Sequence, residues 1–155
     1  PASFGLWGEK NSVWYRIKEY YFDSRREGYQ RTDEEHYAKL EELVGNRKVS
    51  RVVVDPSAAS FIEVIRRHKR FNAVPAENNF VNGIRLVSQA LKDGRIKICS
   101  TCKDARREFA LYRWDTKNGA DVPIKENDHS MDDIRYFTAS ISTGKKGFSV
   151  FALRR

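Results

Sequence analysis

Three residues carry side chains whose types and spacing suit metal chemistry. Asp55 directly follows the apolar run Val49–Val54, so it should lie at the carboxyl edge of a sheet, where functional groups of α/β proteins gather. His129 and Asp132 are three residues apart near the start of a predicted helix, a spacing that puts both side chains on one face. Carboxylates and an imidazole are suitable ligands for a divalent cation. The pattern therefore predicts a metal site.

Each of these residues also has a purely structural interpretation. Asp133 points about 100° away from Asp132 on a helix, so it ranks second to Asp132 as a ligand. Asp55 precedes Pro56 and could instead be a helix N-cap. His129 could be an exposed capping residue, and both neighbouring acids could simply favour the positive end of the helix. The residues alone leave both interpretations open.

The elements that must position these residues follow from apolar periodicity and turn signals. Strands are expected at residues 4–7, 12–22, 49–54, 71–76, 96–99 and 147–153. Helices are expected at residues 32–44, 56–69, 78–92, 101–114 and 130–141. The first two strands should form a hairpin that turns at residues 8–11. A hairpin followed by strands that alternate with helices predicts an α/β fold, a mixed sheet flanked by helices.

Aromatic residues dominate the second predicted strand. Strand alternation places Trp14, Tyr20 and Phe22 on one face and Tyr15 and Tyr21 on the other. Packing of the sheet faces explains these residues better than base stacking.

Composition indicates one compact domain. The 155 residues are 40% hydrophobic and 12% aromatic, which argues against disorder. No apolar run approaches the roughly 18 residues that span a bilayer, so no membrane partner is expected. Cys99 and Cys102 form a lone Cys-Ser-Thr-Cys, and with only three histidines in the chain we expect two ordinary thiols rather than a zinc site.

The net charge of +8 is concentrated in the middle of the chain. Between Arg47 and Arg107 there are 14 Lys and Arg residues but only five Asp and Glu residues. Such an excess predicts an anionic polymer, most simply DNA, although solvated helix faces would give the same composition. Lys125 could contact the scissile phosphate or be a solvated loop residue. The other candidate DNA contacts cluster at one predicted helix end and are Arg66, Arg67, Lys69 and Arg70.

Several ordered motifs resemble the C-terminal nuclease domain of tailed-phage or prophage terminase large subunits. They are the segments Val52–Ser57 (VVVDPS), Asn82–Arg85 (NGIR) and Pro123–Tyr136 (PIKENDHSMDDIRY), with Tyr15–Gly28 similar to the family's second strand and following loop. The resemblance covers nearly the whole chain. It implies a single nuclease domain over residues 1–155, an RNase H-like fold, and an endonuclease that cuts concatemeric double-stranded DNA during packaging.

The resemblance also implies the site. Asp55 matches the acid that ends the fourth strand, and His129 and Asp132 match the late pair on the last helix, with Asp133 as a further possible metal ligand. The family's first acid lies shortly before a proline that corresponds to Pro1, so this chain begins after it and is expected to be impaired unless upstream residues supply the acid. No Gly-Lys-Ser/Thr phosphate loop is present, so the ATPase domain is expected elsewhere.

The implied chemistry is hydrolysis of a phosphodiester assisted by two Mg²⁺ or Mn²⁺ ions. Expected partners are double-stranded DNA and, through the full-length parent, the small terminase subunit and the portal protein. The expected location is the cytoplasm of an infected or lysogenic bacterial host rather than the mature virion. Two alternatives stay open: a catalytically silent DNA-binding or assembly module on an RNase H-like fold, and another RNase H-like nuclease such as a resolvase, which the late His/Asp pair disfavours.

Overall fold

A computed structural model describes residues 2–77, 80–111, 128–141 and 148–154, which contain six strands and six helices. The strands are β1 (Ala2–Lys10), β2 (Val13–Phe22), β3 (Val49–Val54), β4 (Ala73–Pro75), β5 (Ile96–Ile98) and β6 (Phe148–Arg154). The helices are α1 (Ser24–Glu27), α2 (Asp33–Val44), α3 (Ala59–His68), α4 (Phe80–Lys92), α5 (Lys103–Leu111) and α6 (His129–Ile141). No helix in these ranges has the length and apolarity needed to cross a membrane.

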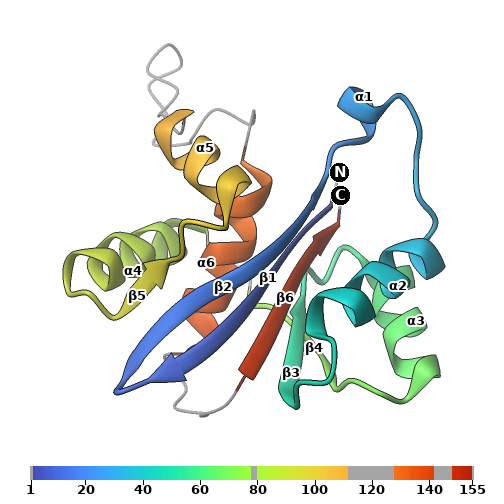
Figure 1. Cartoon of the computed structure of the whole chain (residues 1–155), viewed down its shortest axis with the longest axis horizontal. Helices are drawn as coiled ribbons and strands as arrows, with labels where there is room; N and C mark the ends of the chain where they lie inside the picture. Colours follow the sequence, from blue (N-terminus) through green and yellow to red (C-terminus); the bar gives the residue numbers. More distant parts are fainter. Residues whose placement is uncertain (1, 78–79, 112–127, 142–147, 155) are drawn as a thin grey trace.

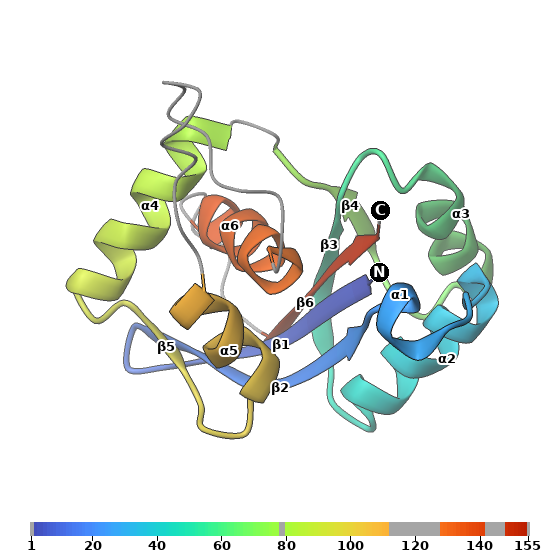
Figure 2. The ribbon, with the colours of Figure 1, turned by 90° about the horizontal axis from the view of Figure 1, so that it is seen from above.

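The strands form one mixed sheet in the order β4-β3-β6-β1-β2-β5. β1 is antiparallel to both β2 and β6, whereas β3 runs parallel to β4 and β6, and β5 runs parallel to β2. In Figure 1 the red β6 lies between β1 and β3, although it is the last strand in sequence. Seen from above, α2 and α3 cover one face of the sheet and α4, α5 and α6 cover the other (Figure 2). The predicted mixed sheet flanked by helices is confirmed.

Strand alternation divides the apolar side chains between two cores, one on each face of the sheet. Phe4 packs toward α2 and α3 and stacks on Phe61, with ring centroids 5.6 Å apart. Trp7 packs toward the other helices and stacks on Phe137 of α6 at 3.9 Å. In β3, Val53 belongs to this second core while its two neighbouring valines belong to the first.

Two turn signals behave differently in the structure. The capping box that opens α2 is present, because Thr32 accepts from the Glu35 N–H while the Glu35 carboxylate accepts from the Thr32 N–H. The hairpin turn, however, comes later than predicted. β1 continues to Lys10, and the turn is made by Asn11 and Ser12, both with positive φ (53° and 64°) as a two-residue hairpin turn requires.

The predicted grouping of aromatic side chains on β2 is wrong. The β1–β2 register shifts so that Trp7 pairs with Arg16 and Leu6 with Lys18, which leaves Ile17 as a bulge. An extra residue reverses the alternation beyond it. Trp14 therefore packs in the α6-side core, whereas Tyr20 packs against the core of α2 and α3.

The helix expected from Pro56 begins only at Ala59. Its N-cap is Ala58, which makes no side-chain capping bond. The carboxylate of Asp55 instead accepts from the Ser57 N–H at 2.8 Å, a local turn outside the helix. The capping interpretation of Asp55 is therefore wrong, and its side chain needs another explanation.

The two cysteines, Cys99 and Cys102, do not form a disulfide. Cys102 is buried, and its Sγ donates to the Arg16 carbonyl at 3.3 Å. Burial raises the pKa of Cys102 to about 11, so this thiol stays protonated at neutral pH.

Candidate functional site

One edge of the sheet collects the termini of several strands. β1 begins and β2 ends there, since Ala2 pairs with Phe22, and the end of β3 reaches the same edge through β6. Asp55 is the first residue beyond β3, two positions after Val53, so alternation directs its side chain toward the face that carries α6. This position at the carboxyl edge agrees with the sequence-based expectation.

The Asp55 carboxylate is buried and directed to α6. Its side chain is 7% exposed overall, one oxygen accepts from the Ser57 N–H, and the other accepts from the Tyr136 hydroxyl at 3.1 Å. Burial and the nearby Asp55 charge raise the pKa of Tyr136, so the phenol remains a donor. The Tyr136 contact fixes Asp55 relative to a helix that lies 81 residues further along the chain.

Asp132 lies one helical turn before Tyr136 and therefore on the same face of α6. Its carboxylate is also buried and accepts from the Arg135 guanidinium at 3.0 Å. That guanidinium lies over the ring of Tyr136, 4.7 Å from its centroid. A continuous set of contacts thus runs from Asp55 through Tyr136 and Arg135 to Asp132.

A glycine of α4 makes room for this set. A Cβ at Gly83 would lie 2.5 Å and 2.7 Å from the side-chain carbons Cγ and Cδ of Arg135. Only glycine lets α4 approach α6 this closely without displacing the arginine stem. Gly83 belongs to the Asn82–Arg85 motif, so the structure gives that motif a packing reason.

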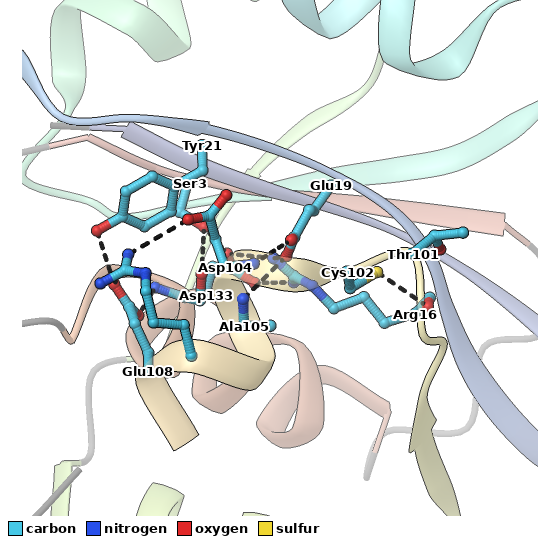
Figure 3. A network of polar contacts seen from close by, with 12 residues as sticks. Ser3, Arg16, Glu19, Tyr21, Thr101, Cys102, Asp104, Ala105, Glu108 and Asp133 are labelled. Atoms are coloured by element: carbon cyan, nitrogen blue, oxygen red, sulfur yellow. Dashed lines mark hydrogen bonds and ion pairs between the residues drawn. The ribbon is translucent and has the colours of Figure 1, made fainter. Parts of the chain in front are cut away.

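Asp133 faces a different environment, as the predicted 100° separation from Asp132 requires. It is fully buried, and both of its oxygens accept from the Arg16 guanidinium of β2, one of them at 3.0 Å; Ser3 of β1 donates to it as well (Figure 3). Burial raises the pKa of Asp133 although Arg16 opposes the shift. Burial tends to lower the pKa of Arg16, but the contacts with Asp133, together with the nearby Glu19, raise it overall. The bulge at Ile17 brings Arg16 to this face of β2.

The start of α6 is held by a buried carboxylate from α5. Glu108 accepts from the Ser130 N–H at 2.6 Å. It also accepts from the Tyr21 hydroxyl at 2.7 Å (Figure 3). A negative group at the positive end of a helix stabilises that end. Burial raises the pKa of Glu108. His129 is half-buried beside this cap, with its ring centroid 6.0 Å from that of Tyr21 and its Nδ1 3.4 Å from the Asp128 carboxylate.

The predicted metal ligands are thus only partly assembled. Asp55 and Asp132 are linked through α6, and their hard carboxylate oxygens suit Mg²⁺ or Mn²⁺. Within the described ranges, however, there is no group of three or more His, Cys, Asp or Glu side chains that could hold a metal ion. Ligation by Asp55, His129, Asp132 and Asp133 therefore stays a prediction. Lys125 lies outside the described residues.

The predicted basic cluster lies at the other end of α3. Because β3 and β4 run parallel, α3 must carry the chain back from the Asp55 edge to the opposite edge of the sheet. Arg67 ion-pairs with Glu34 of α2, and Arg70 with Glu41 at 3.1 Å. Arg66 and Lys69 are exposed at the same helix end. Their contact with DNA stays a prediction.

Sequence reasoning missed four residues of the site. Tyr136 and Arg135 could have been found from their spacing, since they lie four and three residues after Asp132 on an adjoining helix surface. Arg16 could not have been found in this way, because the direction of its side chain depends on a bulge that the sequence does not predict. Glu108 gives no local signal either, since a charged residue in a helix is usually solvent-exposed.

Comparisons with known proteins find relatives of the chain, although no family model matches it. The chain is 26% identical over 137 residues to the terminase large subunit of Escherichia phage T5, covering 84% of this chain and 31% of that protein. It is 42% identical to the large terminase of a thermophilic bacteriophage, solved in complex with ADP, with a TM-score of 0.87 over 92% of this chain and 37% of that one.

The P22 large terminase nuclease domain shares the fold at 19% identity, with a TM-score of 0.68 over 91% of this chain and 74% of that domain. The chain spans about a third of the length of the relatives from phage T5 and the thermophilic phage. It has the RNase H-like α/β fold and is homologous to terminase large subunits.

Proposed function

We propose that this chain is the metal-dependent nuclease domain of a terminase large subunit, which cuts concatemeric double-stranded DNA during viral packaging. The observation that carries the proposal is the hydrogen bond between Tyr136 and Asp55, with Asp132 one turn earlier on the same helix. It ties Asp55 to the helix that carries Asp132, and by resemblance both carboxylates match the family's acidic site. Homology to terminase large subunits and the fold of the P22 nuclease domain support it.

In this proposal the chain's residues position the reacting groups. Asp55 and Asp132 supply carboxylate oxygens to Mg²⁺ or Mn²⁺, while Tyr136 and Arg135 hold those carboxylates in place. His129 would ligate a metal or orient the attacking water. A bound metal would supply a deprotonated water and would stabilise charge on the attacking and leaving oxygens, most effectively as a pair of ions.

We also propose a cellular setting for this activity. Double-stranded DNA is the substrate, and contacts with a small terminase subunit and a portal protein would be made through a longer parent protein. The site of action is the cytoplasm of a bacterial host.

Plasmid nicking tests the proposal directly. The assay compares this chain with a version that supplies an acidic residue ahead of Pro1, each with Mn²⁺ and with excess chelator. We expect metal-dependent nicking by the extended version. Asp55→Asn and Asp132→Asn should each reduce its rate by about 100-fold or more, because a neutral amide replaces a charged ligand. Asp93→Asn, the same change at an exposed residue, should have no effect.

The two Asn variants must first be shown to fold, by circular dichroism and urea unfolding. A folded Asp55→Asn protein that nicks at the normal rate would remove Asp55 from the chemistry. An extended protein that binds duplex but never nicks it with Mn²⁺ would favour the alternative, a catalytically silent DNA-binding module.

A further inference from the structure

We propose that residues 23–31, the arm between β2 and α2, form a contact surface for double-stranded DNA beside the Asp55 edge of the sheet. Arg25 and Arg26 would bind phosphates. The identity of the partner rests on the proposed function, whereas the position and build of the arm rest on the structure alone.

The arm presents its cations to solvent. Arg25 and Arg26 lie on α1, and both side chains are exposed. Among the described residues, no carboxylate lies within ion-pair distance of either guanidinium. Of the two acids in the arm, Asp23 is occupied as the N-cap of α1 and accepts from the Arg25 N–H at 3.0 Å, and Glu27 is exposed. The two arginines are therefore available to an anionic partner.

The rest of the arm is fixed against β2 by aromatic contacts. The Arg31 guanidinium lies over the ring of Phe22 at 4.7 Å and donates to the hydroxyls of Tyr20 and Tyr29, at 2.7 and 3.1 Å. Tyr29 also packs edge-on against Phe22, with ring centroids 5.3 Å apart, yet remains 49% exposed. A surface ordered before binding loses less conformational entropy when it meets its partner.

The arm lies at the same edge of the sheet as Asp55. It follows Phe22, whose partner Ala2 begins β1 at this edge, and Figure 2 shows α1 beside the N-terminus. β2 and β3 are three strand spacings apart in the sheet, or about 14 Å. Duplex DNA carries one phosphate charge per roughly 1.7 Å of its axis. A duplex with a phosphodiester at Asp55 can therefore place other phosphates over the arm within a few base pairs.

The basic end of α3 is positioned less favourably for the same duplex. It lies a ten-residue helix, about 15 Å, behind the Asp55 edge, and two of its arginines are paired with carboxylates of α2. Binding at the arm and binding at the end of α3 therefore predict that different cations contribute to the affinity for DNA. They also offer matched variants, because each contains two exposed cations without an ion pair in the described part of the chain.

The test measures binding of a fluorescent 30-base-pair duplex by anisotropy, in chelator so that no cutting occurs, over a series of salt concentrations. The Arg25→Ala/Arg26→Ala variant is compared with Arg66→Ala/Lys69→Ala, which removes the same charge at the other edge. We expect the arm variant to bind about tenfold more weakly at 0.1 M salt, with a salt slope reduced by about two, roughly one for each phosphate contact. The α3 variant, which removes two of the cations that the sequence predicts as DNA contacts, should lose markedly less affinity than the arm variant.

A charge-preserving variant, Arg25→Lys/Arg26→Lys, should restore most of the affinity if the contacts are to phosphates. Equal losses in the two alanine variants, a larger loss at α3, or no salt-dependent binding by the unmodified chain would each overturn the proposal. If binding depends on the arm but the extended protein never nicks plasmid, the nuclease function is rejected and the arm proposal is kept. If the extended protein nicks and binds DNA normally after Arg25 and Arg26 are replaced by alanine, the arm proposal is rejected and the nuclease function is kept.

Discussion

At the scale of single residues, the Tyr136 hydroxyl joins the two halves of the candidate site. We expect Tyr136→Phe to lower the free energy of unfolding by about 1–3 kcal/mol, because a buried carboxylate loses a donor and nothing fills its place. Metal-dependent nicking by the extended protein should also fall, since Asp55 is no longer held against α6. Urea unfolding and the plasmid assay measure the two effects.

Tyr15→Phe is the matched control for this change. It also removes a tyrosine hydroxyl, but Tyr15 is a partly exposed residue of β2 whose hydroxyl makes no hydrogen bond within the described residues. The free energy of unfolding should therefore change by less than about 0.5 kcal/mol. If Tyr136→Phe behaves like Tyr15→Phe in both assays, the contact with Asp55 has no positioning role.

Asp133 should behave as an anchor of α6. Asp133→Asn leaves the buried Arg16 guanidinium without its main counter-charge, so we expect a loss of about 3–5 kcal/mol in unfolding free energy. Per folded molecule, nicking should survive better than in Asp132→Asn. The double variant Arg16→Met/Asp133→Asn should recover part of the stability, because it removes the unpaired charge. A stable Asp133→Asn protein that cannot nick would instead place Asp133 in the chemistry.

Residue-level prediction succeeded where helix or strand periodicity decides direction. Asp132 and Asp133 have different surroundings because successive residues of a helix are rotated by about 100°. The direction of the Asp55 side chain follows from the alternation of side chains along β3. It failed for Asp55 as a cap, because Pro56 marked a helix start that the chain delays to Ala59. It also could not reveal Arg16, whose partner is 117 residues away in sequence.

At the scale of elements, the packing of α2 against the sheet depends on a neutral histidine. His36 is buried, and its Nδ1 lies 3.2 Å from the Tyr20 hydroxyl. Burial, aided by Arg31, lowers the pKa of His36 to about 4 from an ordinary value of 6.5. The unfolded chain therefore binds this proton more readily, so its contribution to stability is present above pH 6.5 and is lost as the pH falls toward 4.

Because folding lowers the pKa of His36 from 6.5 to about 4, the expected loss of stability between pH 8 and pH 5 is about 2 kcal/mol. Urea unfolding of the unmodified chain and of His36→Gln at both pH values isolates it, because all other groups titrate alike in the two proteins. The unmodified chain should lose about 2 kcal/mol more than the variant. If both proteins lose the same free energy of unfolding, His36 accepts a proton as easily in the folded chain as in the unfolded chain.

Most elements could be predicted from the sequence because local signals define them. The capping box fixed the start of α2, and the apolar run at residues 49–54 matches β3. The bulge in β2 could not be predicted, since Ile17 is as good a strand residue as its neighbours and only the pairing with β1 selects it. That bulge turns Arg16, and later Tyr20, to opposite faces and so determines which helices β2 can hold.

At the scale of the whole molecule, the net charge of +8 should govern the general affinity for DNA. We expect weak binding to any duplex, with an affinity that falls steeply as salt rises, because neutralising phosphates releases counterions and carries no sequence information. Competition between unrelated duplexes of equal length, measured by anisotropy at several salt concentrations, checks this. A strong preference for one sequence would contradict the electrostatic origin.

The order of the strands was beyond sequence reasoning. Local patterns identify strands one at a time, but they do not say that the last strand enters between the first and the third. Topology rules narrow the possibilities without choosing among them. The class of fold was therefore predictable, whereas the neighbours of β6 required the structure.

The central place of β6 has a consequence for how the polypeptide is made. During synthesis β3 and β4 can pair with each other, and β1 can pair with β2, but the two groups have no common partner until residues 148–154 leave the ribosome. Until then the inner edges of β1 and β3 expose unpaired backbone beside largely buried side chains, which is the condition that promotes edge-to-edge aggregation. The nascent chain should therefore complete its sheet late, and ribosomes that stall before Phe148 should release an insoluble product.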